Sequence, residues 1–186
     1  MKDILYSVIE NIGREKIQAD VVANINSSQN YIHNIIGECI ANLNVGPDPD
    51  DNEKAIATLG EALLHFMLTV CTIPSERKIH VKENLTLDVI IPNLRGLKKE
   101  PEKSIIIQFI KDDTQLSNVS GLGFLQPNYE NIWLIYVKPP LASKYTTYSL
   151  LYNDAEFYNN NNYSNIIIDI SKFLGETGDN SFKFIH

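Results

Sequence analysis

The chain has 186 residues and a mass of 21.1 kDa, with 44% hydrophobic and 21% charged residues. This length and composition predict one ordinary globular domain with a sizeable core, and they exclude disordered, collagen-like and coiled-coil classes. The 16 basic and 23 acidic residues give a formal net charge of −7, which excludes a protein that coats nucleic acid by bulk electrostatics. Any contact with DNA or RNA must therefore be local.

The first 72 residues have apolar side chains at intervals of three and four, the pattern of helices with one buried face. The expected helices cover 4–12, 17–25, 27–43 and 53–72. Gly13 weakens the pattern between the first two, an acidic linker over 46–52 precedes the fourth, and Pro74 ends it. Cys39 and Cys71 fall in these segments without metal-binding spacing, so we expect both to be small buried residues.

After Pro74 the hydrophobic pattern becomes typical of strands. The expected strands cover 78–81, 85–91, 104–110, 132–137 and 166–170, with a hairpin turn over 82–84, and short helices are expected within 113–126 and from Ser143 onward. The uninterrupted apolar runs at 105–107 and 132–137 favour central strands covered on both faces. These elements predict a mixed α/β sheet flanked by helices and preceded by a helical N-terminal segment. We expect the helical segment to span 1–50 and the α/β core 51–186, together forming one compact domain.

Targeting signals are not expected in this sequence. Asp3 and Glu10 interrupt the start of the chain, which therefore does not match a signal peptide. The longest apolar stretch, 62–71, is much shorter than the ~20 residues of a membrane span. We therefore expect a cytoplasmic protein.

Polar residues interrupt the apolar patterns at Glu61 in the fourth helix, at Asp88 in the second strand, and at Gln108 and Lys111 in the third. Burying an ionised carboxylate without a partner costs several kcal/mol. Asp88 is therefore expected to face water at a strand end, to pair with a base, or to hold a cation. Its possible basic partners are Lys78 and Lys111.

In their order along the chain, Glu61, Asp88 and the segment from Gln108 to Lys111 resemble the PD-(D/E)xK nuclease superfamily. That superfamily includes restriction endonucleases and archaeal Holliday-junction resolvases. Its members bring a helical Glu, an Asp on the second strand and an acid-x-Lys pair on the third to one edge of the sheet. The resemblance covers residues 53–138 and implies a restriction-endonuclease-like fold with metal-dependent hydrolysis of DNA or RNA, using Mg²⁺ or Mn²⁺.

The resemblance assigns a role to each candidate catalytic residue. Asp88 would be a metal ligand, Glu61 a supporting ligand or water holder, Gln108 a ligand through its amide oxygen, and Lys111 the basic partner. A lysine beside the attacking water stabilises developing negative charge or helps to deprotonate the water. The candidate catalytic residues are thus Glu61, Asp88, Gln108 and Lys111, and the first three are the candidate metal ligands.

The sequence departs from the superfamily pattern at two positions. Gln108 stands where an acid is expected and brings no negative charge, and the lysine position two residues later is Ile110. Because side chains alternate along a strand, Lys111 points away from Gln108 unless a bulge turns it round. Two functions stay open: an active metal-dependent nuclease, or an inactive nuclease-fold protein that serves as a nucleic-acid-binding or protein-interaction module.

Each candidate also has a purely structural interpretation. Glu61 can be a residue at the edge of its helix's apolar stripe, with a pair one turn away. Asp88 can be an ordinary ion-paired residue, and Gln108 a satisfied polar group in a sheet. Lys111 can be a charge that marks the exit of a strand.

The charge is unevenly distributed, with formal charges of −6 over 1–75, +3 over 76–111 and −4 over 112–186. The basic middle third contains a cluster of four cations, Arg95, Lys98, Lys99 and Lys103. This cluster is either a solvated turn or a loop that faces the phosphates of a nucleic acid. The first helices carry Ile and Val on more than one side, which favours a twofold homodimer.

Overall fold

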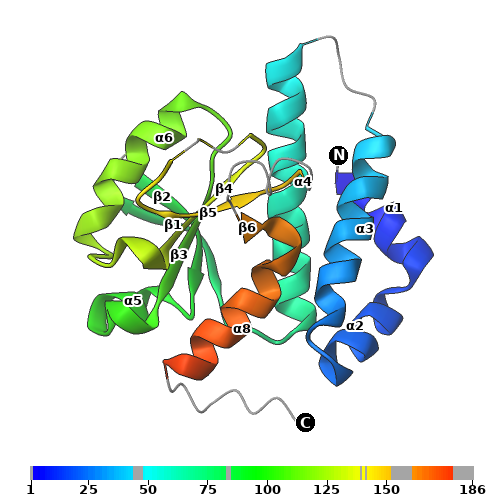
Figure 1. The fold of residues 1–186 in the computed structure, drawn as a ribbon, viewed down its shortest axis with the longest axis horizontal. Coiled ribbons are helices and arrows are strands. Elements are labelled where there is room, and N and C mark those ends of the chain that lie inside the picture. Colours follow the sequence, from blue (N-terminus) through cyan, green and yellow to red (C-terminus); the bar gives the residue numbers. More distant parts are fainter. Residues whose placement is uncertain are drawn as a thin grey trace. The chain divides into compact units, whose positions relative to one another are not determined.

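The computed structural model describes residues 2–43, 48–82, 85–138, 140, 142–151 and 161–177, without the side chains of residues 2, 82, 113, 114 and 118. Contacts between Cα atoms divide the chain into two units. The helical unit combines Met1–Ile73 with Tyr163–His186, and the strand unit is the continuous stretch Pro74–Asn162 (Figure 1). The helical unit is therefore assembled from two separate parts of the chain.

Helix α3 is the centre of the helical unit, because it contacts each of the other helices described there. The helices are α1 (Lys2–Ile12), α2 (Arg14–Ala23), α3 (Ser27–Ala41), α4 (Pro49–Val70) and α8 (Ile166–Glu176), the last preceded by a 3-10 turn at Tyr163–Asn165. The buried side chains of α3 include Ile32, Ile35 and Cys39, which are spaced three and four apart. The predicted amphipathic pattern thus corresponds to a real buried face.

Local sequence signals account for where the long helix α4 begins. The Asp48 side chain accepts a hydrogen bond of 3.0 Å from the backbone N–H of Asp50, and Pro49 occupies the first turn. An aspartate cap followed by proline is a favourable helix start, since the cap satisfies an N–H that has no partner within the helix. The helix ends at Val70, four residues before Pro74.

The strand unit contains one six-stranded sheet in the order β1-β2-β3-β4-β5-β6. The strands are β1 (Glu76–Lys82), β2 (Leu85–Ile91), β3 (Ile105–Phe109), β4 (Ile132–Tyr136), β5 (Thr146–Ser149) and β6 (Asn161–Asn162). The pairs β1–β2 and β2–β3 are antiparallel, and the pairs from β3 to β6 are parallel. The prediction of a mixed α/β sheet with a helical N-terminal part is confirmed.

Two short helices of the strand unit cover one side of the sheet (Figure 1). Leu97 of α5 (Leu94–Lys99) and Val119 of α6 (Asp113–Val119) belong to a buried apolar cluster with Leu87, Ile106 and Leu134 of the sheet. All five side chains of β3 and of β4 are buried, as expected for central strands. Strand β2 lies between β1, its hairpin partner, and the buried central strands β3 and β4.

Two elements differ from the sequence prediction. The segment expected as a strand over 166–170 begins helix α8, in which Ile166, Ile167, Ile170 and Leu174 form one buried face. The helix expected from Ser143 is instead β5, whose Tyr148 ring lies 5.3 Å from that of Trp133 on β4. The predicted core boundary at residue 51 and the homodimer stay predictions. Within the described residues, every helix is too short or too polar to cross a membrane.

Candidate functional site

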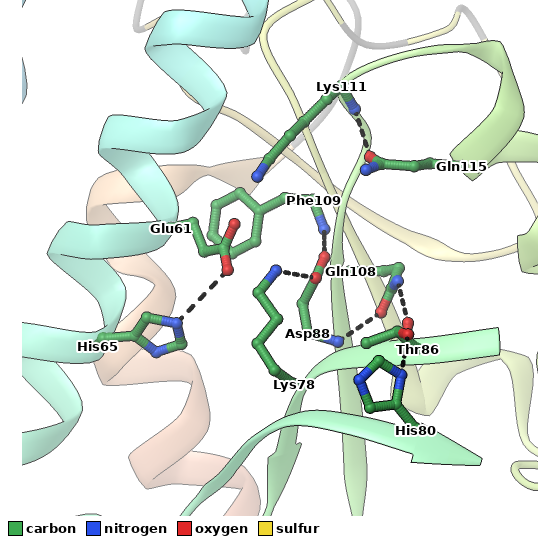
Figure 2. A network of polar contacts seen from close by, with 10 residues as sticks. All are labelled: Glu61, His65, Lys78, His80, Thr86, Asp88, Gln108, Phe109, Lys111 and Gln115. Carbon is green, nitrogen blue, oxygen red and sulfur yellow. Dashed lines mark hydrogen bonds and ion pairs between the residues drawn. The ribbon is translucent and has the colours of Figure 1, made fainter. Parts of the chain in front are cut away.

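Asp88 is a buried carboxylate in the apolar strand β2, and both of its oxygens have donors (Figure 2). The Lys78 Nζ atom lies 2.6 Å from Oδ1, and the backbone N–H of Phe109 donates to Oδ2 at 2.9 Å. One charged donor and one neutral donor supply the pairing that a buried carboxylate requires. Of the two basic partners expected for Asp88, Lys78 is therefore found in contact with it.

Gln108 joins β2 and β3 through both polar atoms of its side chain. Its Oε1 atom accepts from the backbone N–H of Asp88 at 3.0 Å, and its Nε2 atom donates to the carbonyl oxygen of Thr86 at 2.9 Å. The backbone ladder between the two strands ends at the neighbouring pair, Val89 with Ile107. The amide of Gln108 thus takes the role that a peptide group of β3 would have in a continued ladder.

Lys78 is held beside Asp88 by the register of the β1–β2 hairpin. Arg77 pairs with Val89 and Ile79 with Leu87, which leaves Lys78 opposite Asp88. The backbone of Lys78 has a φ of 52°, in the left-handed region that residues other than glycine seldom adopt. Such a conformation costs of order 1–3 kcal/mol and persists only where its surroundings impose it. The Lys78 side chain is 51% exposed, whereas that of Asp88 is 7% exposed.

Lys111 lies beyond the end of β3, which stops at Phe109. The backbone N–H of Ile110 donates to Ile135, and that of Lys111 donates to the side-chain oxygen of Gln115 at 2.9 Å. Because the regular strand ends first, strict alternation of side chains does not decide where the Lys111 ammonium points. Its role as the basic partner stays a prediction.

Glu61 belongs to helix α4 of the helical unit, where it is 6% exposed. Its Oε1 atom lies 3.6 Å from Nε2 of His65, one helical turn later, as the structural interpretation anticipated. The hydroxyl of the buried Tyr163 donates to the carbonyl of Gly60 at 2.6 Å. Burial, and then the negative charge of Glu61, raises the pKa of Tyr163 well above its usual value. The assignment of Glu61 to a site with Asp88 stays a prediction.

The predicted basic cluster borders an open hollow in the strand unit. Glu76, Leu94, Arg95, Lys98 and Lys99 line this hollow, whose volume is about 680 Å³. A hydrogen bond of 3.0 Å from the backbone N–H of Leu94 to the Glu76 carboxylate ties the start of α5 to β1. Three of the four predicted cations therefore surround one depression.

The fourth predicted cation, Lys103, has a different setting. Its ammonium lies 3.1 Å from the carboxylate of Glu100, three residues earlier. Both side chains are about half exposed, so this pair contributes little to stability. Lys103 is thus engaged in a local surface pair.

Comparison with solved structures identifies the architecture. Metal-depleted Ecl18kI in complex with uncleaved, modified DNA superimposes with a TM-score of 0.58 at 8% identity, over 97% of this chain and 80% of that chain. The restriction endonuclease PspGI–substrate DNA complex gives 0.54 at 14% identity, over 94% and 93%. The chain has a restriction-endonuclease-like fold. No family model and no curated protein matches the sequence, and the resemblance predicted from the four candidate residues is confirmed at the level of the fold.

A metal in a restriction-endonuclease-like fold would need oxygen ligands, and the strand unit offers few of them. Mg²⁺ is usually held by one or two carboxylates, several waters and substrate phosphates. Asp88 supplies one carboxylate, whereas Gln108 supplies a neutral amide oxygen that already accepts from Asp88. No group of three or more His, Cys, Asp or Glu side chains suited to a metal occurs within the described part of the chain. With one carboxylate from the strand unit, a cation at Asp88 would need waters and the phosphate of a substrate for its remaining ligands.

The sequence interpretation named Lys78 as a possible basic partner of Asp88 but did not include it among the candidate catalytic residues. The signal was present, because a hairpin centred on residue 83 places position 78 opposite position 88. Counting along the predicted hairpin would have favoured Lys78 over Lys111 as the partner of Asp88. Register, rather than residue type, identifies Lys78.

Proposed function

We propose that this chain is a divalent-metal-dependent nuclease that hydrolyses a phosphodiester bond of DNA at a site centred on Asp88. The observation that supports the proposal is the buried Asp88 carboxylate in the middle of an apolar strand, paired with an ammonium and a backbone N–H. A well-packed apolar residue at a buried position is often as stable as a buried ion pair, or more so. The carboxylate is therefore better explained by a need for charge than by a need for stability.

The chemistry of phosphodiester hydrolysis matches these groups. A bound Mg²⁺ would supply a Lewis acid and an activated water, with Asp88 as its carboxylate ligand. The Lys78 ammonium stands where it can neutralise negative charge on a phosphate. Gln108 fixes the Asp88 backbone, and Glu61 and Lys111 are proposed as supporting ligand and basic partner.

We propose the hollow lined by Arg95, Lys98 and Lys99 as the surface that contacts the nucleic-acid backbone. Three cations around one depression form a local positive field on a chain whose net charge is −7. Phosphate contacts of this kind position a nucleic acid without reading its sequence. DNA is favoured over RNA as the substrate because the solved structures with this fold described above are DNA complexes.

A second candidate is an inactive nuclease-fold protein that binds nucleic acid. The observation that favours it is that the candidate ligands are already bonded to other groups of the strand unit. Lys78 neutralises Asp88, and the Gln108 amide bonds to two backbone groups of β2. In this arrangement the strands supply one carboxylate, which is already paired. The two candidates predict the same DNA binding and differ in cleavage.

The test is incubation of plasmid and duplex oligonucleotide DNA with Mg²⁺, Mn²⁺ or EDTA, with binding measured in parallel. We expect metal-dependent cleavage that falls by about 10²–10³-fold in Asp88→Asn, since the metal that would stabilise the negatively charged transition state loses its carboxylate ligand. Glu130→Gln, which removes an exposed carboxylate from the same unit, should cleave like the wild type. Binding without cleavage under every metal condition would support the inactive module. Undiminished cleavage by Asp88→Asn would refute a site at Asp88.

A further inference from the structure

The Asp88 carboxylate has two oxygens, and Lys78 already occupies one of them. Its ammonium lies 2.6 Å from Oδ1, while Oδ2 accepts from the backbone N–H of Phe109. A Mg²⁺ held by Asp88 would have to approach the same oxygen. Two positive centres would then share one oxygen atom and repel each other. Oδ1 retains a second lone pair, but the ammonium beside it lowers the affinity of that oxygen for a divalent cation.

The backbone of the β1–β2 hairpin places Lys78 opposite Asp88. Lys78 adopts a φ of 52° inside a strand, between hairpin pairs that fix it opposite Asp88. Glycine or asparagine would adopt this conformation at lower cost. A lysine kept at a position that favours glycine or asparagine is a reason to look for a function of its side chain.

The two partners differ in their access to solvent. The Asp88 side chain is 7% exposed and is held by Phe109, whereas the Lys78 side chain is 51% exposed. A phosphate that arrives from solvent can therefore attract the ammonium while Asp88 stays in place.

We infer that Lys78 is a built-in competitor of divalent metal at Asp88. The ammonium neutralises Asp88 while no nucleic acid is bound, and a phosphodiester draws the ammonium away and frees Oδ1 for a cation. Metal binding is thereby coupled to the binding of phosphate. The inference deepens the proposed function and rests on it in one respect, since it takes Asp88 to be the metal ligand.

The test measures metal binding without any cleavage assay. Wild type, Lys78→Asn and Lys78→Arg are titrated with Mn²⁺ in calorimetry and in thermal melting, in the absence of nucleic acid. Asn accepts the left-handed backbone and removes the charge, whereas Arg keeps the charge. We expect Lys78→Asn to bind Mn²⁺ on the order of tenfold more tightly than wild type and to gain melting temperature, because the competing charge is gone. Lys78→Arg should behave like wild type.

Two further variants make the result specific. Arg77→Gln removes one positive charge from the neighbouring position of β1 and should leave Mn²⁺ affinity unchanged. Asp88→Asn combined with Lys78→Asn should abolish the gain, because the ligand is then missing. Equal Mn²⁺ affinity in wild type and Lys78→Asn, or a gain that survives Asp88→Asn, would overturn the inference.

A second measurement covers the case in which Lys78→Asn fails to fold. Wild-type chain is titrated with Mn²⁺ alone and in the presence of a phosphorothioate duplex that resists cleavage. Because the duplex phosphates also bind Mn²⁺, the gain in Mn²⁺ affinity with the duplex is compared with that of Lys78→Gln, which lacks the competing charge. A larger gain in the wild-type chain supports the coupling, and an equal gain in both contradicts it. The outcome is independent of nuclease activity. An inactive protein can still show the competition, and an active one can lack it.

Discussion

Gln108 occupies the position where an acidic ligand was expected, and its amide serves the sheet instead. Oε1 accepts from Asp88 and Nε2 donates to Thr86, so both ends of the amide are used between β2 and β3. A carboxylate can reproduce the first of these bonds but not the second, since it has no N–H to donate. An amide at this position therefore stabilises the sheet, whereas an acid would add negative charge for a metal and lose one hydrogen bond between the strands.

Gln108→Glu is expected to lower the melting temperature in the absence of metal. The Thr86 carbonyl loses its donor and a second negative charge is placed near Asp88, for a combined loss on the order of 1–3 kcal/mol. Mn²⁺ should recover part of this loss if the position belongs to a metal site, as thermal melting with and without metal will show. Gln115→Glu is the matched control, because the side-chain oxygen of Gln115 accepts from the backbone N–H of Lys111 and a carboxylate can do the same. A variant that melts lower and gains nothing from Mn²⁺ would mark Gln108 as a structural residue alone.

The two cysteines are expected to be unreactive in the folded chain. Burial raises the pKa of Cys71 to about 12, and burial together with the charge of Glu38 raises that of Cys39 to about 11. At pH 8 the nucleophilic thiolate is then scarcely populated in the folded state and is far more abundant after unfolding. A chromogenic disulfide reagent should report almost no reaction at pH 8 without denaturant and two thiols with it. Rapid modification of the native protein would contradict the buried placement of Cys39 and Cys71.

At the scale of elements, one glycine sets the junction between the first two helices. Gly13 separates α1 from α2 with a φ of 97° and a ψ of 107°, a conformation that side chains strongly disfavour. The weakened helical pattern at this residue was visible in the sequence. The backbone angle explains why the chain makes two helices there rather than one.

Gly13→Ala should destabilise the helical unit by about 1–3 kcal/mol, because alanine must adopt a strained backbone or move both helices. The control is Gly37→Ala in the middle of α3, where a new Cβ would meet no heavy atom within 4 Å. That change should stabilise by roughly 0.5–1 kcal/mol, since alanine is the better helix former. Denaturant unfolding of both variants measures the difference. Equal stability of the two would mean that the Gly13 conformation is not required.

The elements that could be predicted from sequence are those whose pattern has one interpretation. The runs that became β2, β3 and β4 are too short for helices and are bounded by turn residues, so they were predicted as strands. The run of three isoleucines at 166–168 fits a buried strand as well as a buried helix. The helix becomes evident only from the burial of Ile170 and Leu174, which continue the same face at helical spacing. Asp88 and Gln108 could be singled out because they are polar within apolar runs. Lys78 could be named only as one of two possible partners of Asp88, because its exposed strand tolerates charge and the pairing of β1 with β2 decides between them.

At the scale of the whole molecule, the excess of basic residues is confined to the middle third of an otherwise acidic sequence. The stretch 76–111 has a formal charge of +3, and it contains both the hollow lined by Arg95, Lys98 and Lys99 and the Lys78–Asp88 pair. The long-range repulsion of a phosphate backbone by the remaining acidic residues is screened within about 10 Å at 0.1 M salt. Local contacts can therefore decide binding.

Replacing Lys98 and Lys99 together by Gln should weaken duplex DNA binding and reduce its dependence on salt. Each lost phosphate contact lowers the slope of log affinity against log salt by about 0.9, so a decrease of roughly 1–2 is expected. Lys16→Gln combined with Lys54→Gln is the control, because both are exposed lysines of the helical unit and the net charge changes equally. Fluorescence anisotropy at several salt concentrations measures the slopes. Identical slopes for the two double variants would assign DNA contacts to another surface.

The helical unit is assembled from two parts of the chain, and this has a consequence for the order of events on the ribosome. Helices α1 to α4 are made first, but α8 and the turn before it, which contact α3, follow only after residues 74–162. At translation rates of about 5–20 residues per second, the apolar surface that α8 covers stays open for roughly 5–20 s. The strand unit is one continuous stretch of the chain, so its sheet can form before α8 is made and covers that surface. Nascent chains released before Tyr163 should consequently be recognised by chaperones through the uncovered face of α3.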